Sequence, residues 1–263
     1  MINFTSKASY RFDDLVEIVR LLRSPGGCPW DREQTHASIR RNFIEETYEA
    51  CEAIDLDDKR LLCEELGDVM LQVVFHAEME AEKGGFTIDD VADGICKKLI
   101  LRHPHIFGEV RVHDSQEVLK NWDEIKKVEK GQHTVTDTLE SVAKSLPSLI
   151  RAQKVQAKAA KCGFDWHDAG GAYDKVAEEL EELKAAPAEK QEEELGDLLF
   201  SVVNVSRFLK IDPERACERT CNKFIARFSK MEALACGRGM RLEDMTLEQM
   251  DELWNEVKAQ EVK

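Results

Sequence analysis

The second half of the chain contains four carboxylates with the spacing expected of metal ligands on two helices. They are Glu179 and Glu182 of the string "EELEE", and Glu194 and Asp197 of the string "EELGD". Residues three or four apart share one face of an α-helix, so the two members of each pair project together. Pro187 lies between the strings and breaks the helix, which leaves room for a turn between antiparallel helices. Such a helix pair would bring the four carboxylates to one point.

A cluster of four carboxylates needs a cation, because the negative charges repel one another. Ligands that are all oxygen favour Mg²⁺, with Mn²⁺ as a substitute, over zinc or copper. Mg²⁺ usually keeps several waters and completes its shell with substrate phosphates. The cluster therefore indicates phosphoryl or pyrophosphate chemistry.

The alternative is a solvated acidic helix face, which is the commoner reason for carboxylates at this spacing. Two features favour the metal site. EELGD runs directly into an apolar stripe, which predicts that its carboxylates lie at the edge of a core. Gly196 costs about 1 kcal/mol relative to alanine inside a helix, and close approach of a neighbouring helix or of substrate would explain it.

Basic and aromatic side chains could bind the rest of a phosphate-bearing substrate. The cations are Lys175, one turn before the first acidic string, and Lys223 and Arg227, one turn apart on a later helix. Trp254 and Trp166 could stack on a nucleobase. Each residue also has a structural alternative, as a helix-surface ion pair or as a tryptophan that packs between helices.

Helical periodicity dominates the chain and predicts an all-α fold. Apolar residues follow both copies of EELGD, at 64–68 and 193–197, with i, i+3, i+4, i+7 spacing. Runs of strict alternation, which would indicate strands, are short. We expect helices at 11–22, 38–55, 59–82, 87–101, 115–129, 138–160, 171–185, 188–209, 213–235 and 246–260.

The two halves of the chain repeat five sequence blocks in the same order. A tryptophan loop ("CPWD" or "GFDW") precedes an acidic helix ("EETYE" or "EELEE") and then EELGD. "KKLILRH" or "NKFIARF" follows, and "NWDEIKK" or "LWNEVKA" closes the half. The repeat predicts two homologous helical domains, 1–130 and 137–263, joined by a linker at 131–136. The carboxylates of the first copy are Glu45, Glu46, Glu49, Glu65 and Asp68.

Composition and charge narrow the possible partners. The formal net charge of −15 repels a nucleic-acid backbone, so we expect no direct nucleic-acid binding. The chain has no apolar stretch of membrane-spanning length and no signal-peptide pattern at its start. Its eight cysteines form no CxxC and no compact framework, which is typical of reduced thiols. These features predict a cytoplasmic protein without a membrane partner.

Several motifs together carry a family resemblance. They are the EExxE…ExxD pattern of "EELEE" and "EELGD", with "CPWD", "RRNFIEETYEA", "KLILRHPHIFGEV", "SLPSLIRAQKVQAKAAKCGFDW" and "EELGDLLFSVVNV". Over essentially its whole length the chain resembles the tandem-domain bacterial members of the MazG family of nucleoside triphosphate pyrophosphohydrolases. The resemblance implies an all-α homodimer, a dimer of helical bundles, that uses Mg²⁺ to hydrolyse nucleoside triphosphates to monophosphate and pyrophosphate. It further implies broad base specificity and a role in clearing non-standard or surplus nucleotides.

The resemblance also implies a role for individual residues. The metal ligands would be Glu179, Glu182, Glu194 and Asp197, and Glu178 or Glu193 would orient the water that attacks the α-phosphorus. The nucleotide contacts would be Lys175, Val176, Ala177, Glu178, Glu179, Lys190, Gln191, Glu192, Glu193, Asp197, Lys223, Phe224, Ile225, Ala226, Arg227 and Trp254.

The first copy departs from this pattern. Asn42 takes the place of Lys175, with Arg41 adjacent as a possible substitute, and "HPHIFGEV" ends the helix early after Arg102. We therefore expect the main catalytic site in the second half. The first copy would be a weaker site, a regulatory nucleotide site or a dimerisation module.

Two other classes of protein stay open. A carboxylate-bridged di-iron or di-manganese bundle would need Glu-x-x-His on two helices, whereas His76 lies eight residues beyond Asp68. A non-catalytic scaffold would use the helical repeat only for interactions. The sequence ranks neither nucleobases nor sugars, and it identifies no regulatory protein partner.

Overall fold

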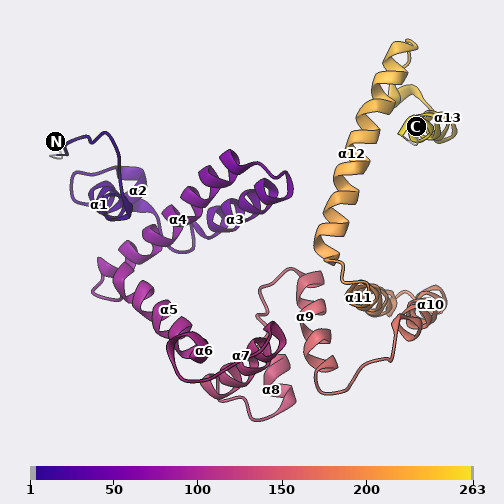
Figure 1. Cartoon of the computed structure of the whole chain (residues 1–263). Helices are drawn as coiled ribbons and strands as arrows, with labels where there is room; N and C mark the ends of the chain where they lie inside the picture. The colour runs from indigo at the N-terminus through magenta and orange to yellow at the C-terminus, as the bar shows by residue number, and fades with distance from the viewer. Residues whose placement is uncertain (1–3, 262–263) are drawn as a thin grey trace. The chain divides into compact units, whose positions relative to one another are not determined.

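The computed structural model describes residues 4–261, and within that range it contains helices and loops but no β-strand. The prediction of an all-α fold is therefore confirmed. The chain divides into two compact units, Met1–Lys126 and Lys127–Lys263, here called unit 1 and unit 2 (Figure 1). The division at 126/127 lies close to the expected linker, and the finer boundaries at 130 and 137 stay a prediction.

Unit 1 is built around a helical hairpin. Its helices are α1 (Phe12–Arg23), α2 (Pro29–Glu33), α3 (Arg40–Asp55), α4 (Lys59–Ala81), α5 (Ile88–Arg102), α6 (Pro104–Phe107) and α7 (Ser115–Glu129), the last of which ends just beyond the boundary. The connection between α3 and α4 is a tight turn. Asp57 adopts a left-handed backbone conformation, and the Asp58 side chain caps α4 by accepting hydrogen bonds from the amides of Arg60 and Leu61. A connection of this length makes α3 and α4 antiparallel neighbours.

The core of unit 1 lies where α1 crosses α4. Val19 of α1 packs with Val74, Phe75 and Met79 of α4, and Ile39 joins them from the segment before α3. Burial of these side chains is the main favourable term for docking α1. Glu65 and Asp68, in the first half of α4, are not members of this core.

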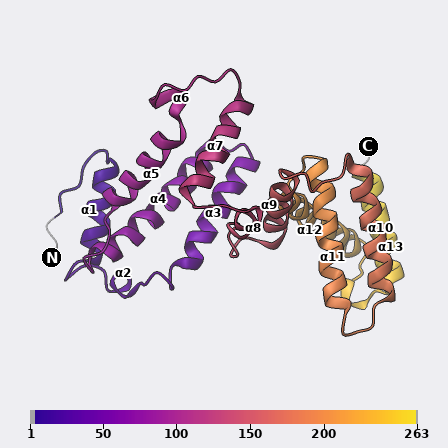
Figure 2. The ribbon, with the colours of Figure 1, turned by 90° about the horizontal axis from the view of Figure 1, so that it is seen from below.

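Unit 2 repeats the hairpin. Its helices are α8 (Val135–Glu140), α9 (Ser148–Ala160), α10 (Ala169–Ala185), α11 (Gln191–Phe208), α12 (Pro213–Gly237) and α13 (Leu247–Glu261), with a 3₁₀ turn η1 (Leu242–Asp244). The hairpin of α10 and α11 is seen side by side in Figure 2, and α9 packs across α11. A separate core of Met231, Ala235, Leu253 and Val257 joins α12 to α13.

Most expected helices are present, with ends within three residues of the prediction. The exception is 138–160, which is two helices: α8 ends at Glu140, and α9 begins directly after Pro147, which disfavours a helical conformation at the residue before it. The short helices α2, α6 and η1 were not predicted. Each spans fewer than six residues, too short for a periodic pattern.

The apolar stripe after EELGD is buried on one side only: Val203 is 2% exposed and Leu198 is half-buried. Leu195, Leu199 and Val202 of α11 are about half exposed. A Cβ added at Gly196 would meet no atom within 4 Å, so no neighbouring helix among the described residues approaches this glycine. The side of the stripe formed by Leu195, Leu199 and Val202 is therefore uncovered by residues 4–261. Separately, no helix among the described residues combines the length and apolarity that crossing a membrane requires.

Candidate metal centre

Three carboxylates of the α10–α11 hairpin meet at one point. Glu179 and Glu182 of α10 and Glu194 of α11 each offer an oxygen atom, and these oxygens all lie within 4.8 Å of one another. Glu179 is only 6% exposed, Glu194 is half-buried and Glu182 is exposed. The helical spacing on α10 and the hairpin turn thus bring together three of the four expected ligands.

Charge repulsion and burial act on this cluster. The pKa of Glu182 is raised, first by burial and then by the negative charge of Glu179, with smaller contributions from Glu178 and Glu194. Lys175 Nζ lies 2.6 Å from Glu179 and 2.9 Å from Glu178. These hydrogen bonds raise the pKa of Lys175 well above its usual range, so the lysine stays charged beside the cluster.

Asp197, the fourth expected ligand, does not belong to the three-carboxylate group. It is exposed on α11, one turn beyond Glu194. The two expected water-orienting carboxylates differ in their surroundings. Glu178 is held by Lys175, whereas Glu193 is exposed in the first turn of α11.

The expected nucleotide contacts divide into two groups. Residues 175–179 and 190–193 border the carboxylate cluster on α10 and α11, whereas 223–227 and Trp254 belong to α12 and α13. Arg227 donates to Glu261 at 2.7 Å, and the ring centroids of Phe224 and Trp254 are 5.1 Å apart. Within residues 4–261, no hydrogen bond or ion pair joins Lys223 or Arg227 to the cluster.

Trp166 fits its structural alternative. A Cβ added at Gly171 would lie 2.2 Å from Trp166 Cδ1, so the indole rests directly on the first turn of α10. Asp165, its neighbour, accepts two hydrogen bonds from the guanidinium of Arg207 on α11. The tryptophan loop of unit 2 is thereby anchored to the hairpin.

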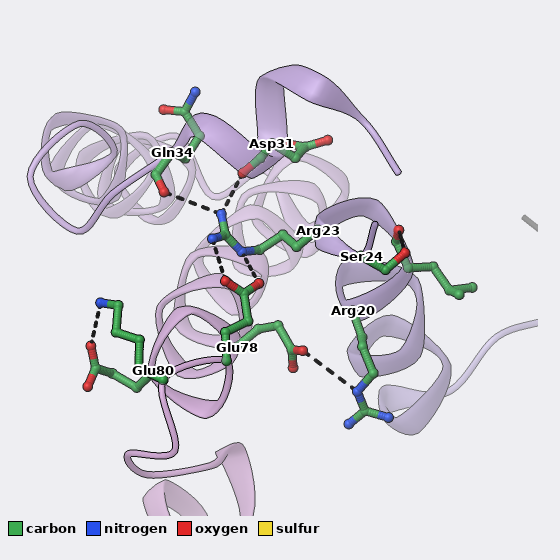
Figure 3. Close-up of polar contacts among 10 residues, drawn as sticks. Arg20, Arg23, Ser24, Asp31, Gln34, Glu78 and Glu80 are labelled. Atoms are coloured by element: carbon green, nitrogen blue, oxygen red, sulfur yellow. Dashed lines mark hydrogen bonds and ion pairs between the residues drawn. The ribbon is translucent and has the colours of Figure 1, made fainter. Parts of the chain in front are cut away.

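An arginine anchors the tryptophan loop of unit 1 as well, and no local sequence pattern predicts it. Figure 3 shows the guanidinium of Arg23 between α4 and this loop. It donates to both carboxylate oxygens of Glu82, at 2.6 and 2.8 Å, and to the carbonyl oxygens of Asp31 and Gln34. Because Arg23 and Glu82 lie far apart in the chain, only the docking of α1 on α4 brings them together.

The carboxylate cluster is repeated in unit 1. Oxygens of Glu46, Glu49 and Glu65 also lie within 4.8 Å of one another. Burial raises the pKa of Glu46, followed by repulsion from Asp68, Glu49 and Glu65. The pKa of Glu65 is raised in the same way, by burial and then by Glu49 and Asp68.

The neighbouring cation is not repeated in unit 1. Asn42 stands at the place of Lys175, and Arg41 pairs with Glu45 at 2.7 Å rather than with the three clustered carboxylates. Unit 1 therefore has the acidic cluster without a lysine inside it.

Fold and site together define a class of protein: a tandem repeat of helical hairpins, each with a carboxylate cluster suited to a hard cation. The MazG nucleotide pyrophosphohydrolase domain matches residues 34–107 and 173–231, which include both clusters. The chain belongs to the MazG family, as the sequence resemblance predicted.

Curated relatives agree with this assignment. The chain is 47% identical to the nucleoside triphosphate pyrophosphohydrolase/pyrophosphatase MazG of Thermotoga maritima, over 96% of this chain and 98% of that protein. It is 42% identical to the nucleoside triphosphate pyrophosphohydrolase of Escherichia coli K12, with the same coverage. The uncharacterized protein YabN of Bacillus subtilis is 49% identical, and the chain spans 52% of its length.

Proposed function

We propose that the protein hydrolyses nucleoside triphosphates at the α-phosphorus, releasing nucleoside monophosphate and pyrophosphate. The observation that carries the proposal is the group of Glu179, Glu182 and Glu194 on α10 and α11, with Lys175 beside it. The names of the Thermotoga maritima and Escherichia coli relatives support the same reaction.

The donor set fits Mg²⁺, with Mn²⁺ as a substitute. Oxygens bound to Mg²⁺ at about 2.1 Å are at most about 4.2 Å apart, so the 4.8 Å group needs only small side-chain rotations to hold an ion. Glu179, Glu182 and Glu194 would hold it, and Asp197 would join through a change of rotamer. A bound Mg²⁺ supplies charge neutralisation on the phosphates and a lower pKa for water.

The chain's own residues would position the substrate. Lys175 would bind phosphate oxygens through charge-assisted hydrogen bonds. Glu178 or Glu193 would orient the attacking water and accept its proton as the bond from the α-phosphorus to the bridging oxygen breaks. Stacking of the base on Trp254 would tolerate any nucleobase, which agrees with broad specificity and with clearance of surplus nucleotides.

We further propose that the protein works as a homodimer. Leu195, Leu199 and Val202 form a partly exposed apolar face on α11, and Phe224 and Ile225 are exposed apolar residues on α12. Clustered apolar surface of this kind is normally covered by a partner. A second copy could also bring the basic and aromatic residues of α12 and α13 to the cluster.

Unit 2 is proposed as the main catalytic unit because Lys175 contacts its cluster, whereas no lysine among residues 4–261 pairs with the cluster of unit 1. Unit 1 would bind nucleotide more weakly or act in regulation or dimerisation.

Product analysis tests the reaction. The protein is incubated with several nucleoside triphosphates and Mg²⁺, and the products are separated by ion exchange. Monophosphate and pyrophosphate are expected in equal amounts. Release of nucleoside diphosphate with inorganic phosphate would contradict attack at the α-phosphorus.

A further inference from the structure

Unit 1 contains a cavity that is distinct from the carboxylate cluster. It lies among α3, α4 and the start of α5, has a volume of about 350 Å³, and is lined by His36, Arg40, Phe43, Val73, His76, Ala77, Phe86 and Val91. This volume is in the range of small-molecule sites. The lining has their usual composition, mostly apolar and aromatic with a few polar groups.

A chain of hydrogen bonds ends at this cavity. Glu80 Oε1 lies 2.6 Å from His36 Nε2, and His36 Nδ1 lies 2.7 Å from His76 Nδ1. The two imidazole rings are within 3° of parallel, and their centroids are 5.0 Å apart. Rings with this spacing share one proton between the facing nitrogens, because two N–H groups there would repel.

The direction of the chain follows from Glu80. Hydrogen bonds from His36 and Lys83 lower the pKa of Glu80, so it is an ionised carboxylate and only accepts. His36 Nε2 must then donate, His36 Nδ1 accepts, and His76 Nδ1 donates. Burial lowers the pKa of His76 and so favours its neutral form, which leaves Nε2 of His76 as a hydrogen-bond acceptor.

Arg40 supplies a cation to the same cavity. Within residues 4–261 it has no ion-pair or hydrogen-bond partner, whereas its neighbour Arg41 is paired with Glu45. An exposed guanidinium at the edge of an apolar cavity is suited to binding a carboxylate or phosphate.

We propose that this cavity binds a small planar aromatic acid that carries a ring N–H or O–H. The aromatic body packs on Phe43 and Phe86, the anionic group binds Arg40, and the ring donor binds Nε2 of His76. A free aromatic acid and a nucleotide share this chemistry.

The site belongs to unit 1 alone. When the two EELGD strings are aligned, Val205 and Leu209 of unit 2 take the places of His76 and Glu80. When the EExxE strings are aligned, Tyr173 takes the place of Arg40. The repeat therefore keeps the hairpin but not the polar groups of the cavity.

The test uses indole-3-acetate, which has all three features, and the full-length protein without nucleotide or metal. Binding is followed through the imidazole ¹⁵N signals of His76, which report on this site only. We expect a saturable shift with a dissociation constant near or below about 1 mM for a ligand of this size. The absence of a saturable shift at about 10 mM overturns the proposal.

Substitutions test the contact between the ligand's carboxylate and Arg40. Arg40→Gln should weaken indole-3-acetate binding by about tenfold or more, the effect of losing a charge-assisted hydrogen bond. Indole, which lacks the carboxylate, should bind the wild type and Arg40→Gln equally. Arg41→Gln is the matched control and should leave both ligands unaffected. Equal weakening by Arg40→Gln and Arg41→Gln would contradict a specific contact.

Ligand changes test the histidine without altering the protein. Naphthalene-1-acetate keeps the aromatic body and the carboxylate but has no ring N–H, and it should bind about fivefold more weakly. If it binds as well as indole-3-acetate, the assigned role of His76 is wrong. Uridine monophosphate is titrated in parallel with indole-3-acetate. Tighter binding of uridine monophosphate indicates a nucleotide as the natural ligand, and tighter binding of indole-3-acetate indicates a free acid.

Discussion

Lys175 Nζ lies 2.6 Å from Oε1 of Glu179, the most buried carboxylate of the α10–α11 cluster. The lysine neutralises part of the cluster's charge, and it lies where the phosphates of a bound nucleotide would need a cation. Unit 1 has Asn42 instead, although its three carboxylates are clustered equally well. We therefore expect substitutions in the cluster of unit 2 to affect activity more than equivalent substitutions in unit 1.

Loss of a proposed metal ligand in unit 2 should remove activity. Glu194→Gln keeps the shape of the side chain but removes its charge, and we expect kcat/KM to fall by at least about 100-fold. The far-ultraviolet circular dichroism spectrum should not change, because the Glu194 side chain has no hydrogen bond or ion pair with residues 4–261. Retained activity would support a non-catalytic scaffold instead.

The control for that variant is Glu65→Gln, the equivalent change in unit 1. It should reduce kcat/KM by less than about threefold, because the main catalytic site is expected in unit 2. A loss as large as that of Glu194→Gln would mean that both units take part in catalysis.

Lys175 should act on the substrate rather than on the fold. Lys175→Gln removes a charge-assisted hydrogen bond to phosphate, and such bonds contribute about 1.5–3 kcal/mol, or roughly 10–100-fold in kcat/KM. Lys184→Gln is the matched control. Lys184 makes a similar ion pair, with Glu181 at 2.8 Å, and Glu181 is not a member of the cluster. Similar kinetics for the two variants would refute the role of Lys175.

The clusters should make the stability of the metal-free protein depend on pH. The pKa of Glu46, Glu65 and Glu182 is raised above the ordinary value of 4.5, so the folded state binds protons more tightly than the unfolded state. Their contribution to stability is therefore largest in acid and is lost as the pH rises above 4.5 through the raised pKa values.

Mg²⁺ should reverse this loss, because it binds only the ionised carboxylates. We expect Mg²⁺ to raise the Tm more at about pH 7 than at about pH 5. Differential scanning calorimetry at the two pH values measures the effect. A rise in Tm that is equal at both would show that these carboxylates do not bind the ion.

The uncovered face of α11 should be a subunit interface. Leu199→Glu places a charge in the middle of that face and should convert the dimer to a monomer in sedimentation velocity. Leu247→Glu, at an exposed leucine at the start of α13, is the control and should leave the assembly unchanged. If Leu199→Glu has no effect on the sedimentation coefficient, this face is not the interface.

Sequence alone predicted most of the long helices and the repeat. Helix ends and shared faces depend on contacts within a few residues, so the spacing of Glu179 and Glu182 and the position of Pro187 predicted the hairpin and the cluster. The start of α9 after Pro147 follows from equally local physics, because proline disfavours a helical conformation at the residue before it.

Tertiary structure decided the rest. The exposure of Leu195, the placement of Asp197 outside the three-carboxylate group and the pairing of Arg227 with Glu261 all depend on which helices pack together. His36 and His76 meet across forty residues in the same way. An i, i+3 pattern shows which side chains share a face, but only the packing of distant helices decides whether that face meets a core, a neighbouring side chain or solvent.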